Sequence, residues 1–224
     1  MAKTPSCKKR KILITAGPTR GMLDPVRFIS NMSTGEMGYS LADIASKKDW
    51  DVTLISGPTA LKPPKLSEYI AITSAAELKK ACEKEFPKHD VLVMVAAVCD
   101  FTAQRKHDHK IHRTHTKQLN LKRTPDILAA LGKKRAGRLA IGFCLETERW
   151  LENAKSKLKR KHLDGIVANY YTKTHIPFGK RRINTAFVTR DGQITHLKHK
   201  TKRQIASALL KWIDEIYRKK SFRY

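Results

Sequence analysis

Five apolar segments alternate with polar stretches and predict the strands of a sheet. They cover residues 11–15, 51–56, 91–97, 139–143 and 164–169. The first two end in Gly-Pro turns, where a strand commonly meets a loop. The run from Val91 to Ala97 is apolar at every position. That pattern is typical of a strand that helices cover on both faces.

Between these strands, apolar residues recur at the three- and four-residue spacing of amphipathic helices. The predicted helices cover residues 35–48, 74–86, 124–131, 147–161 and 202–218. Ser33 and Thr34 precede the first helix as candidate caps, and Pro125 suits the first turn of the third. Ser74 followed by Glu77 has the spacing of a capping box, so the second helix is expected to begin there.

The alternation of strands and helices predicts an α/β fold of the Rossmann-like, doubly wound type, with a mostly parallel sheet. Asp191-Gly192 lies between two strand-like segments and is a strong hairpin signal. We therefore expect a C-terminal β-hairpin extension at one edge of the sheet. A single domain is expected over residues 11–218, with a basic tail at 1–10 and another at 219–224.

The charge of the chain is strongly positive. It has 46 Lys and Arg against 20 Asp and Glu, a formal charge of +26 over 224 residues. Such a charge attracts polyanions, either nucleic acid or phosphorylated small molecules. The cations are spread from end to end, which favours a solvated surface, and the 7% of aromatic residues offers little for base stacking. We therefore expect no nucleic acid partner.

The same composition bears on the compartment. No apolar run approaches the roughly 20 residues that cross a bilayer, and the basic N-terminus lacks the apolar core of a signal peptide. A cytoplasmic protein without a membrane partner is expected. Cys7, Cys82, Cys99 and Cys144 are far apart and form no C-x-x-C pair. This is typical of reduced thiols rather than disulfides or a zinc site.

Two long irregular segments, 16–34 and 98–122, leave the predicted strands at their carboxyl ends. Open α/β sheets bind ligands there, and loops of that length are usually functional or disordered. The nearby glycines do not form G-x-G-x-x-G, and no P-loop occurs, which disfavours a redox dinucleotide site and a Walker-type site. The amides of Ser33, Thr34 and Gly35, at the start of a predicted helix, are candidates for holding a phosphate.

The segment Asp24-Pro-Val-Arg-Phe-Ile-Ser-Asn31, followed by Ser33-Thr-Gly-Glu-Met-Gly38, resembles the signature of the bacterial phosphopantothenate–cysteine ligases. Further motifs similar to that family follow in order along the chain. They are 14–20, 52–59, 96–101, Lys110-Ile111, 123–128, Gly142-Phe143, Glu146-Thr147, the pair Lys157 and Lys161, and 164–169. The resemblance covers nearly the whole chain, from about residue 11 to about residue 212.

The resemblance implies a ligase of coenzyme A biosynthesis that joins 4′-phosphopantothenate to L-cysteine. The carboxylate attacks the α-phosphorus of CTP, pyrophosphate leaves, and the cysteine amine then displaces CMP from the acyl-cytidylate. It also implies Mg²⁺ accompanying CTP, and a homodimer. Because only ten residues precede the first strand, we expect no flavin in this chain and a separate decarboxylase partner. The same reaction with ATP, or a catalytically decayed nucleic-acid-binding protein on this scaffold, are the alternatives.

Three residues are carried over from the family as catalytic: Asn31, Arg27 and Lys110. Fixed cations offset the repulsion between a carboxylate and a triphosphate, and Lys110 is the candidate for that role. The Asn31 amide is expected to hydrogen-bond the acyl-cytidylate. Arg27 is either part of this site or the structural ion-pair partner of Asp24.

The resemblance also implies a nucleotide site and a phosphate cradle. The residues carried over to the nucleotide site are Met94, Val95, Ala96, Asp100, Lys110, Pro125, Asp126, Ile127, Leu128, Phe143, Lys157 and Lys161. Phe143 is suited to packing on a base. Lys157 and Lys161 share one helical face, which either reaches one anion or is simply an exposed charged face. Ser33, Thr34 and Gly35 are the expected cradle.

Three features depart from the family or suggest other chemistry. Glu36 stands where the family usually has a lysine, so it either points into solvent or weakens phosphate binding. Cys99 is interpreted as a small apolar side chain. The histidine-rich stretch 107–115 lacks tetrahedral ligand spacing, which favours a solvated flap over a metal site. We therefore assign no metal ligand.

Overall fold

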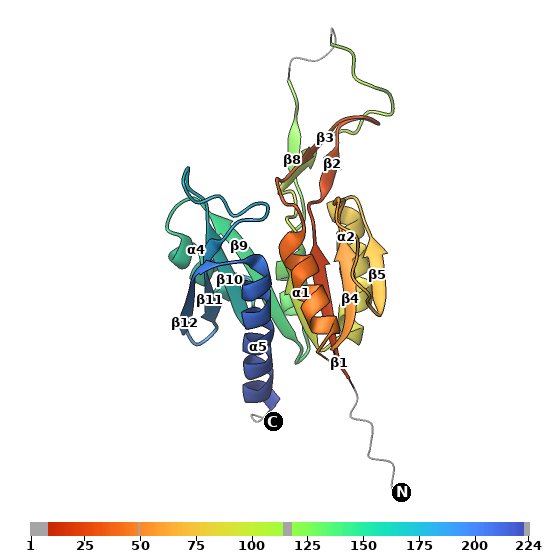
Figure 1. The fold of residues 1–224 in the computed structure, drawn as a ribbon. Coiled ribbons are helices and arrows are strands. Elements are labelled where there is room, and N and C mark those ends of the chain that lie inside the picture. The colour runs from red at the N-terminus through yellow and green to blue at the C-terminus, as the bar shows by residue number, and fades with distance from the viewer. Residues whose placement is uncertain (1–8, 49, 114–117, 222–224) are drawn as a thin grey trace, which may run out of the picture.

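An eight-stranded sheet forms the centre of the molecule, in a computed structural model that describes residues 9–48, 50–113 and 118–221 (Figure 1). The strand order is β12-β11-β10-β9-β6-β1-β4-β5. These strands are β1 (Arg10–Ala16), β4 (Trp50–Ser56), β5 (Glu68–Ala71), β6 (Val91–Met94), β9 (Leu139–Glu146), β10 (Gly165–Tyr170), β11 (Ile183–Thr189) and β12 (Ile194–Lys200). All neighbours from β5 to β10 pair in parallel, and β11 and β12 add an antiparallel hairpin. The predicted doubly wound fold and its hairpin extension are confirmed.

Helices cover both faces of this sheet. They are α1 (Glu36–Ser46), α2 (Ala75–Glu85), α3 (Ile127–Lys133), α4 (Trp150–Arg160) and α5 (Lys202–Ser221), with a 3₁₀ turn at Phe86–Lys88. Ile12 and Ile14 of β1 pack toward α1 and α5, whereas Leu13 between them packs toward α2, α3 and α4. Alternate residues of a strand point to opposite faces, so one short apolar run serves two cores.

The carboxyl end of the sheet is fixed by a side chain. The sequence predicts a strand over 91–97, but β6 ends at Met94. The Thr15 hydroxyl oxygen accepts the amides of Val95 and Ala96 at 3.1 and 3.0 Å. The hydroxyl replaces a backbone carbonyl, so the strand ladder stops and the chain turns away from the sheet.

Two predicted helix starts are wrong. The N-cap of α1 is Gly35, with φ +79° and no side-chain cap, so Ser33 and Thr34 do not cap this helix. Instead, the Ser33 hydroxyl accepts the amide of Gly35 at 3.3 Å and closes a turn before the helix. Pro125 precedes α3 because the cap there is Asp126, which accepts the amide of Ala129. The Ser74 cap of α2 is confirmed, at 3.2 Å from the amide of Glu77.

The two long irregular segments contain short antiparallel strand pairs. The pairs are β2 (Arg20–Met22) with β3 (Phe28–Ser30), and β7 (Phe101–Ala103) with β8 (Leu121–Arg123). β2 lies against β7, and the pairs project beyond the carboxyl end of the main sheet (Figure 1). We call residues 20–30 and 101–123 the extension, of which 114–117 lie outside the described residues.

The two expected basic tails lie partly within the first strand and the last helix. Arg10 already belongs to β1, and residues 219–221 belong to α5; residues 1–8 and 222–224 of the expected tails lie outside the described residues. Within the described ranges, no helix combines the length and apolarity required to span a bilayer.

Candidate functional site

Two adjoining cavities open at the carboxyl ends of the central strands. The α4 cavity, of about 600 Å³, lies between the ends of β6 and β9, the start of α3 and the last turn of α4. The α1 cavity, of about 180 Å³, lies where α1 and α5 begin. Both are lined by Ala96, Ala97, Phe143, Cys144 and Leu145. A ligand that passes Phe143 can therefore contact both cavities.

The α4 cavity brings together most of the residues expected to bind a nucleotide. Those on its wall are Met94, Ala96, Asp100, Pro125, Asp126, Ile127, Leu128, Phe143, Lys157 and Lys161. Val95 lines the α1 cavity instead, and Lys110 lies in neither. Arg123 and Arg160 also line the α4 cavity and were not predicted. The four cations make this cavity suited to a polyphosphate.

Lys157 and Lys161 are held toward the α4 cavity by carboxylates. The Lys157 ammonium lies 2.5 Å from Glu146, and the Lys161 ammonium lies 3.0 Å from Asp126. Burial raises the pKa of Asp126, but the Ala129 amide and the Lys161 ammonium outweigh it and leave that pKa below its usual range. Both lysines are thus oriented before any ligand arrives, rather than forming an exposed charged face.

The α1 cavity contains the expected phosphate cradle. Ser33, Thr34 and Gly35 line it together with Val95 and Asn169. Gly35 has a positive φ, and a Cβ there would lie 2.7 Å from a methyl carbon of another loop, so only glycine fits. The first amides of a helix lack intrahelical acceptors and carry the positive end of its dipole. This end of α1 is therefore favourable for an anion.

Glu36 is not an isolated anion at this site. Its carboxylate lies 3.1 Å from the ammonium of Lys202, the first residue of α5. The same ammonium donates to the carbonyl oxygen of Gly179 at 2.5 Å. The side chain of Lys202 is only 8% exposed, and it lines the α1 cavity. Sequence reasoning missed this lysine because its partner is 166 residues away.

Asn31 lines neither cavity, but it contacts the segment that lines them. Its amide nitrogen donates to the carbonyl oxygens of Ala97 and Val98, both at 3.0 Å. Ala97 in turn pairs with the chain at Gly17 and Thr19 through backbone bonds of 2.9 and 3.1 Å. These bonds fix the segment that lines both cavities.

Arg27 and Lys110 line a third cavity, of about 620 Å³, within the extension. The Arg27 guanidinium binds Asp24 through Nε at 2.8 Å and Nη2 at 2.5 Å, and donates to the Ile111 carbonyl at 2.7 Å. Asp24 also accepts the amides of Val26, Arg27 and Ile111. The ion pair considered for Arg27 is present. Within one chain, the structure does not bring Arg27 or Lys110 to the α1 or α4 cavity.

The three cysteines in the described part of the chain are buried, and Cys144 among them lines both cavities. Burial raises the pKa of Cys144 to about 11 and that of Cys82 to about 12, so both thiols stay protonated near neutral pH. Cys99 is buried, as expected of a small apolar side chain. Among the described residues, no three His, Cys, Asp or Glu side chains gather as a metal site. His115 of the histidine-rich stretch lies outside the described residues.

Comparison with known proteins identifies relatives of the whole chain. The family model of the DNA/pantothenate metabolism flavoprotein C-terminal domain matches residues 7–217. A cysteine/cysteine sulfinic acid decarboxylase from an unknown prokaryotic organism is 41% identical over 207 residues, which are 91% of this chain and 58% of that protein. The coenzyme A biosynthesis bifunctional protein CoaBC of Bacillus subtilis (strain 168) is 39% identical over 206 residues, which are 91% of this chain and 51% of that protein.

A solved structure agrees with the fold. The crystal structure of the C-terminal domain of coenzyme A biosynthesis bifunctional protein CoaBC superposes with a TM-score of 0.80 at 36% identity, covering 94% of this chain and 96% of that one. The chain thus matches one solved domain over nearly its full length. It spans only about half the length of the curated relatives.

Proposed function

The chain belongs to the family of the DNA/pantothenate metabolism flavoprotein C-terminal domain, and we propose that it is a CTP-dependent phosphopantothenate–cysteine ligase of the cytoplasm. The observation that carries this proposal is the pair of cavities that meet at Phe143. One has the cations that a triphosphate needs, and the other has the helix start that a phosphorylated acid needs. A reaction between these two substrates requires such adjoining sites.

In the first step, CTP occupies the α4 cavity with its triphosphate near Lys157 and Lys161. The carboxylate of 4′-phosphopantothenate reaches past Phe143 and attacks the α-phosphorus. The bond between the α-phosphorus and its bridging oxygen breaks, pyrophosphate leaves, and an acyl-cytidylate forms. Preorganised cations lower the barrier because they meet the charge that develops on the phosphates.

In the second step, the cysteine amine attacks the carbonyl carbon of the acyl-cytidylate. The carbon–oxygen bond to CMP breaks, CMP leaves, and the amine loses a proton as the amide forms. Asn31 donates to the carbonyl oxygen of Ala97, which lines both cavities, and the acyl group would be held between those cavities. Its side chain orients the loop at Ala97 and offers its amide oxygen to the intermediate.

Mg²⁺ enters this scheme with the triphosphate rather than as a resident ion. Its chemistry would be to neutralise phosphate charge, and a carboxylate oxygen is a ligand that it accepts. Asp100 fits that role because it lines the α4 cavity, while Asp126 and Glu146 are engaged by lysines. The separate decarboxylase and the absence of flavin stay predictions.

We further propose a homodimer formed through the extension. Apolar side chains are exposed there on three of its strands and on its loops: Val26, Phe28, Phe101, Leu119 and Leu121. Exposed apolar side chains that gather in one part of a molecule are typical of interaction surfaces. Lys110 lies outside both cavities of its own chain. In a homodimer it would be able to approach a cavity of the partner chain instead.

The test is an assay of the purified chain with 4′-phosphopantothenate, cysteine, Mg²⁺ and either CTP or ATP. We expect pyrophosphate release with CTP that depends on the acid, and CMP release that depends on cysteine. Pyrophosphate release with ATP but not with CTP would identify ATP as the nucleotide substrate. No release with either would contradict the ligase and favour the nucleic-acid-binding alternative. Carbon dioxide release from cysteine without nucleotide would indicate the activity named for the 41% identical relative.

A further inference from the structure

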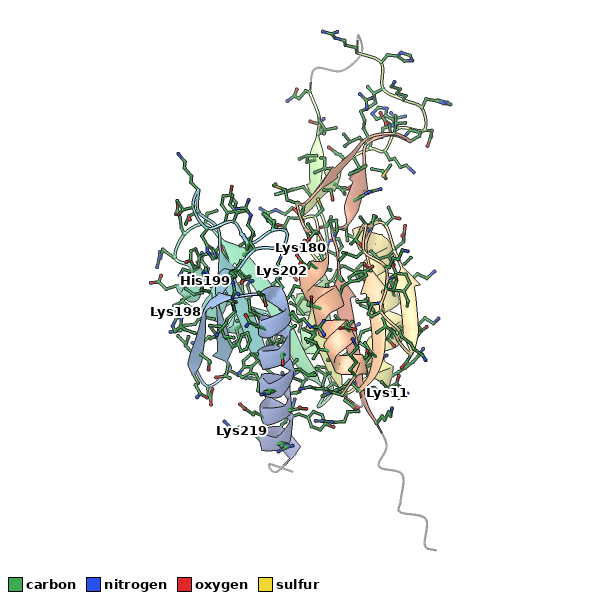
Figure 2. The ribbon with its side chains drawn as sticks, viewed as in Figure 1. Lys11, Lys180, Lys198, His199, Lys202 and Lys219 are labelled. Atoms are coloured by element: carbon green, nitrogen blue, oxygen red, sulfur yellow. The ribbon has the colours of Figure 1, made fainter. Side chains whose placement is uncertain are left out.

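Lys202 is a buried cation in the smaller of the two cavities. It is the first residue of α5, and Figure 2 shows it at the upper end of that helix, beside Lys180. Its ammonium has two described acceptors, Glu36 at 3.1 Å and the Gly179 carbonyl at 2.5 Å. An ammonium has three N–H groups. Two of them have acceptors among the described residues, and Lys202 lines the α1 cavity.

Binding of an anion in the α1 cavity requires the positive charge of Lys202. Glu36 and Lys202 are its only charged lining residues in the described part of the chain. Without Lys202, a phosphate at the start of α1 would meet the negative charge of Glu36 in a partly enclosed space. With Lys202, the pair is neutral and a lysine lines the cavity beside the start of α1.

The position of the cavity defines which end of a substrate it receives. The α1 and α4 cavities share the wall at Phe143, and the reacting carboxylate must reach the nucleotide in the α4 cavity. The opposite end of the same molecule then lies in the α1 cavity. In 4′-phosphopantothenate that end is a phosphate monoester.

We propose that Lys202 is the specificity-determining cation for the phosphate of the acid substrate, and that Glu36 orients it. The proposal rests on the proposed ligase function. It assigns to α5 the charge that a lysine at position 36 would have supplied from α1. The phosphate accepts hydrogen bonds from Lys202 and from the first-turn amides of α1, while Glu36 remains paired with Lys202.

The test compares binding of 4′-phosphopantothenate and of pantothenate, which lacks the phosphate, by calorimetry without nucleotide. In Lys202→Met, we expect the Kd of 4′-phosphopantothenate to rise at least tenfold and that of pantothenate to change less than twofold. Lys202→Arg should restore most of the preference for the phosphorylated acid. Glu36→Gln should lower the Kd of 4′-phosphopantothenate about threefold or more, because it removes a negative charge and keeps an acceptor for Lys202.

Arg203→Met is the matched control, because Arg203 also joins α5 to α1, through Asp43 at 2.8 Å, and does not line the cavity. It should leave both dissociation constants unchanged. Equal losses for both acids in Lys202→Met, or the same loss in Arg203→Met, would overturn the proposal. Should Lys202→Met fail to fold, Glu36→Gln decides, because an unchanged Kd of 4′-phosphopantothenate in that variant would also overturn the proposal.

The binding readout separates this proposal from the proposed function. If the wild-type chain releases no pyrophosphate but Lys202→Met loses the preference for the phosphorylated acid, the ligase fails and the Lys202 site stands. If the wild-type chain turns over and Lys202→Met discriminates as well as the wild type, the Lys202 site alone fails.

Discussion

The Asn31 side chain donates to the carbonyl oxygen of Ala97 at 3.0 Å, across 66 residues of sequence. A second bond from the same nitrogen reaches Val98 at 3.0 Å. The segment that follows β3 is thereby joined to the loop after β6, where Ala97 lines both cavities. Asn31 therefore fixes the backbone of the loop that lines the candidate site.

Asn31→Ala should lower kcat/KM for pyrophosphate release about tenfold or more, since both the loop and the acyl-cytidylate lose a partner. Ser30→Ala is a matched control, because the Ser30 hydroxyl also donates to a backbone carbonyl, but that carbonyl, of Thr19 at 2.9 Å, belongs to a residue that lines neither cavity. Steady-state assays of both variants provide the measurement. Wild-type turnover in Asn31→Ala would remove Asn31 from the mechanism.

Replacing Lys157 or Lys161 by methionine should raise the KM for CTP about tenfold or more each. A hydrogen bond to a charged group contributes about 1.5–3 kcal/mol, and the variant also leaves Glu146 or Asp126 unpaired beside the triphosphate. Lys159→Met on the same helix is the control, since Lys159 is exposed and does not line the α4 cavity. An equal effect of all three substitutions would indicate general electrostatics instead of a site.

The inner strands of the central sheet were predictable because they are mostly apolar, and the helices because they have one apolar face. The exact ends of strands and helices were not predictable where a single residue decides them. The Thr15 hydroxyl ends β6 at Met94, and Gly35 replaces Ser33 as a cap. The edge strand β5 has only one partly buried residue, Ile70, so it lacks an apolar pattern.

The α4 cavity was largely predictable because its residues fall within continuous motifs along the chain. In the α1 cavity, Ser33, Thr34 and Gly35 were expected but Lys202 was not, because its contact joins α1 to the start of α5. Local patterns contain no information on a pair such as Glu36 and Lys202, separated by 166 residues. The extension was also missed, since strands of three residues are too short for periodicity to reveal.

Asp24→Asn should destabilise the extension at neutral pH but not in acid. The Arg27 guanidinium is the main cause that holds the pKa of Asp24 well below its usual range. A carboxyl group with a lowered folded-state pKa stabilises the fold above its unfolded pKa of about 3.9 and loses that contribution as the pH falls toward the folded value. Urea unfolding of both proteins from pH 7 to pH 2.5 measures this. We expect the difference in unfolding free energy between wild type and variant to be constant above about pH 5 and to shrink below about pH 4. A difference that is constant over the whole range would mean that the charge of Asp24 does not contribute and that only its shape matters.

Leu121→Asp should dissociate the proposed homodimer. Leu121 lies in β8 of the extension with 46% of its surface exposed, and a charge at the centre of an apolar interface is costly to bury. Leu61→Asp is the matched control, because Leu61 is 37% exposed in a loop outside the extension. Sedimentation velocity should give a dimer for the wild type and Leu61→Asp and a monomer for Leu121→Asp. Because Lys110 lies outside both cavities of its own chain, turnover should fall together with the dimer. A fully active Leu121→Asp monomer would mean that the extension serves only the chain to which it belongs.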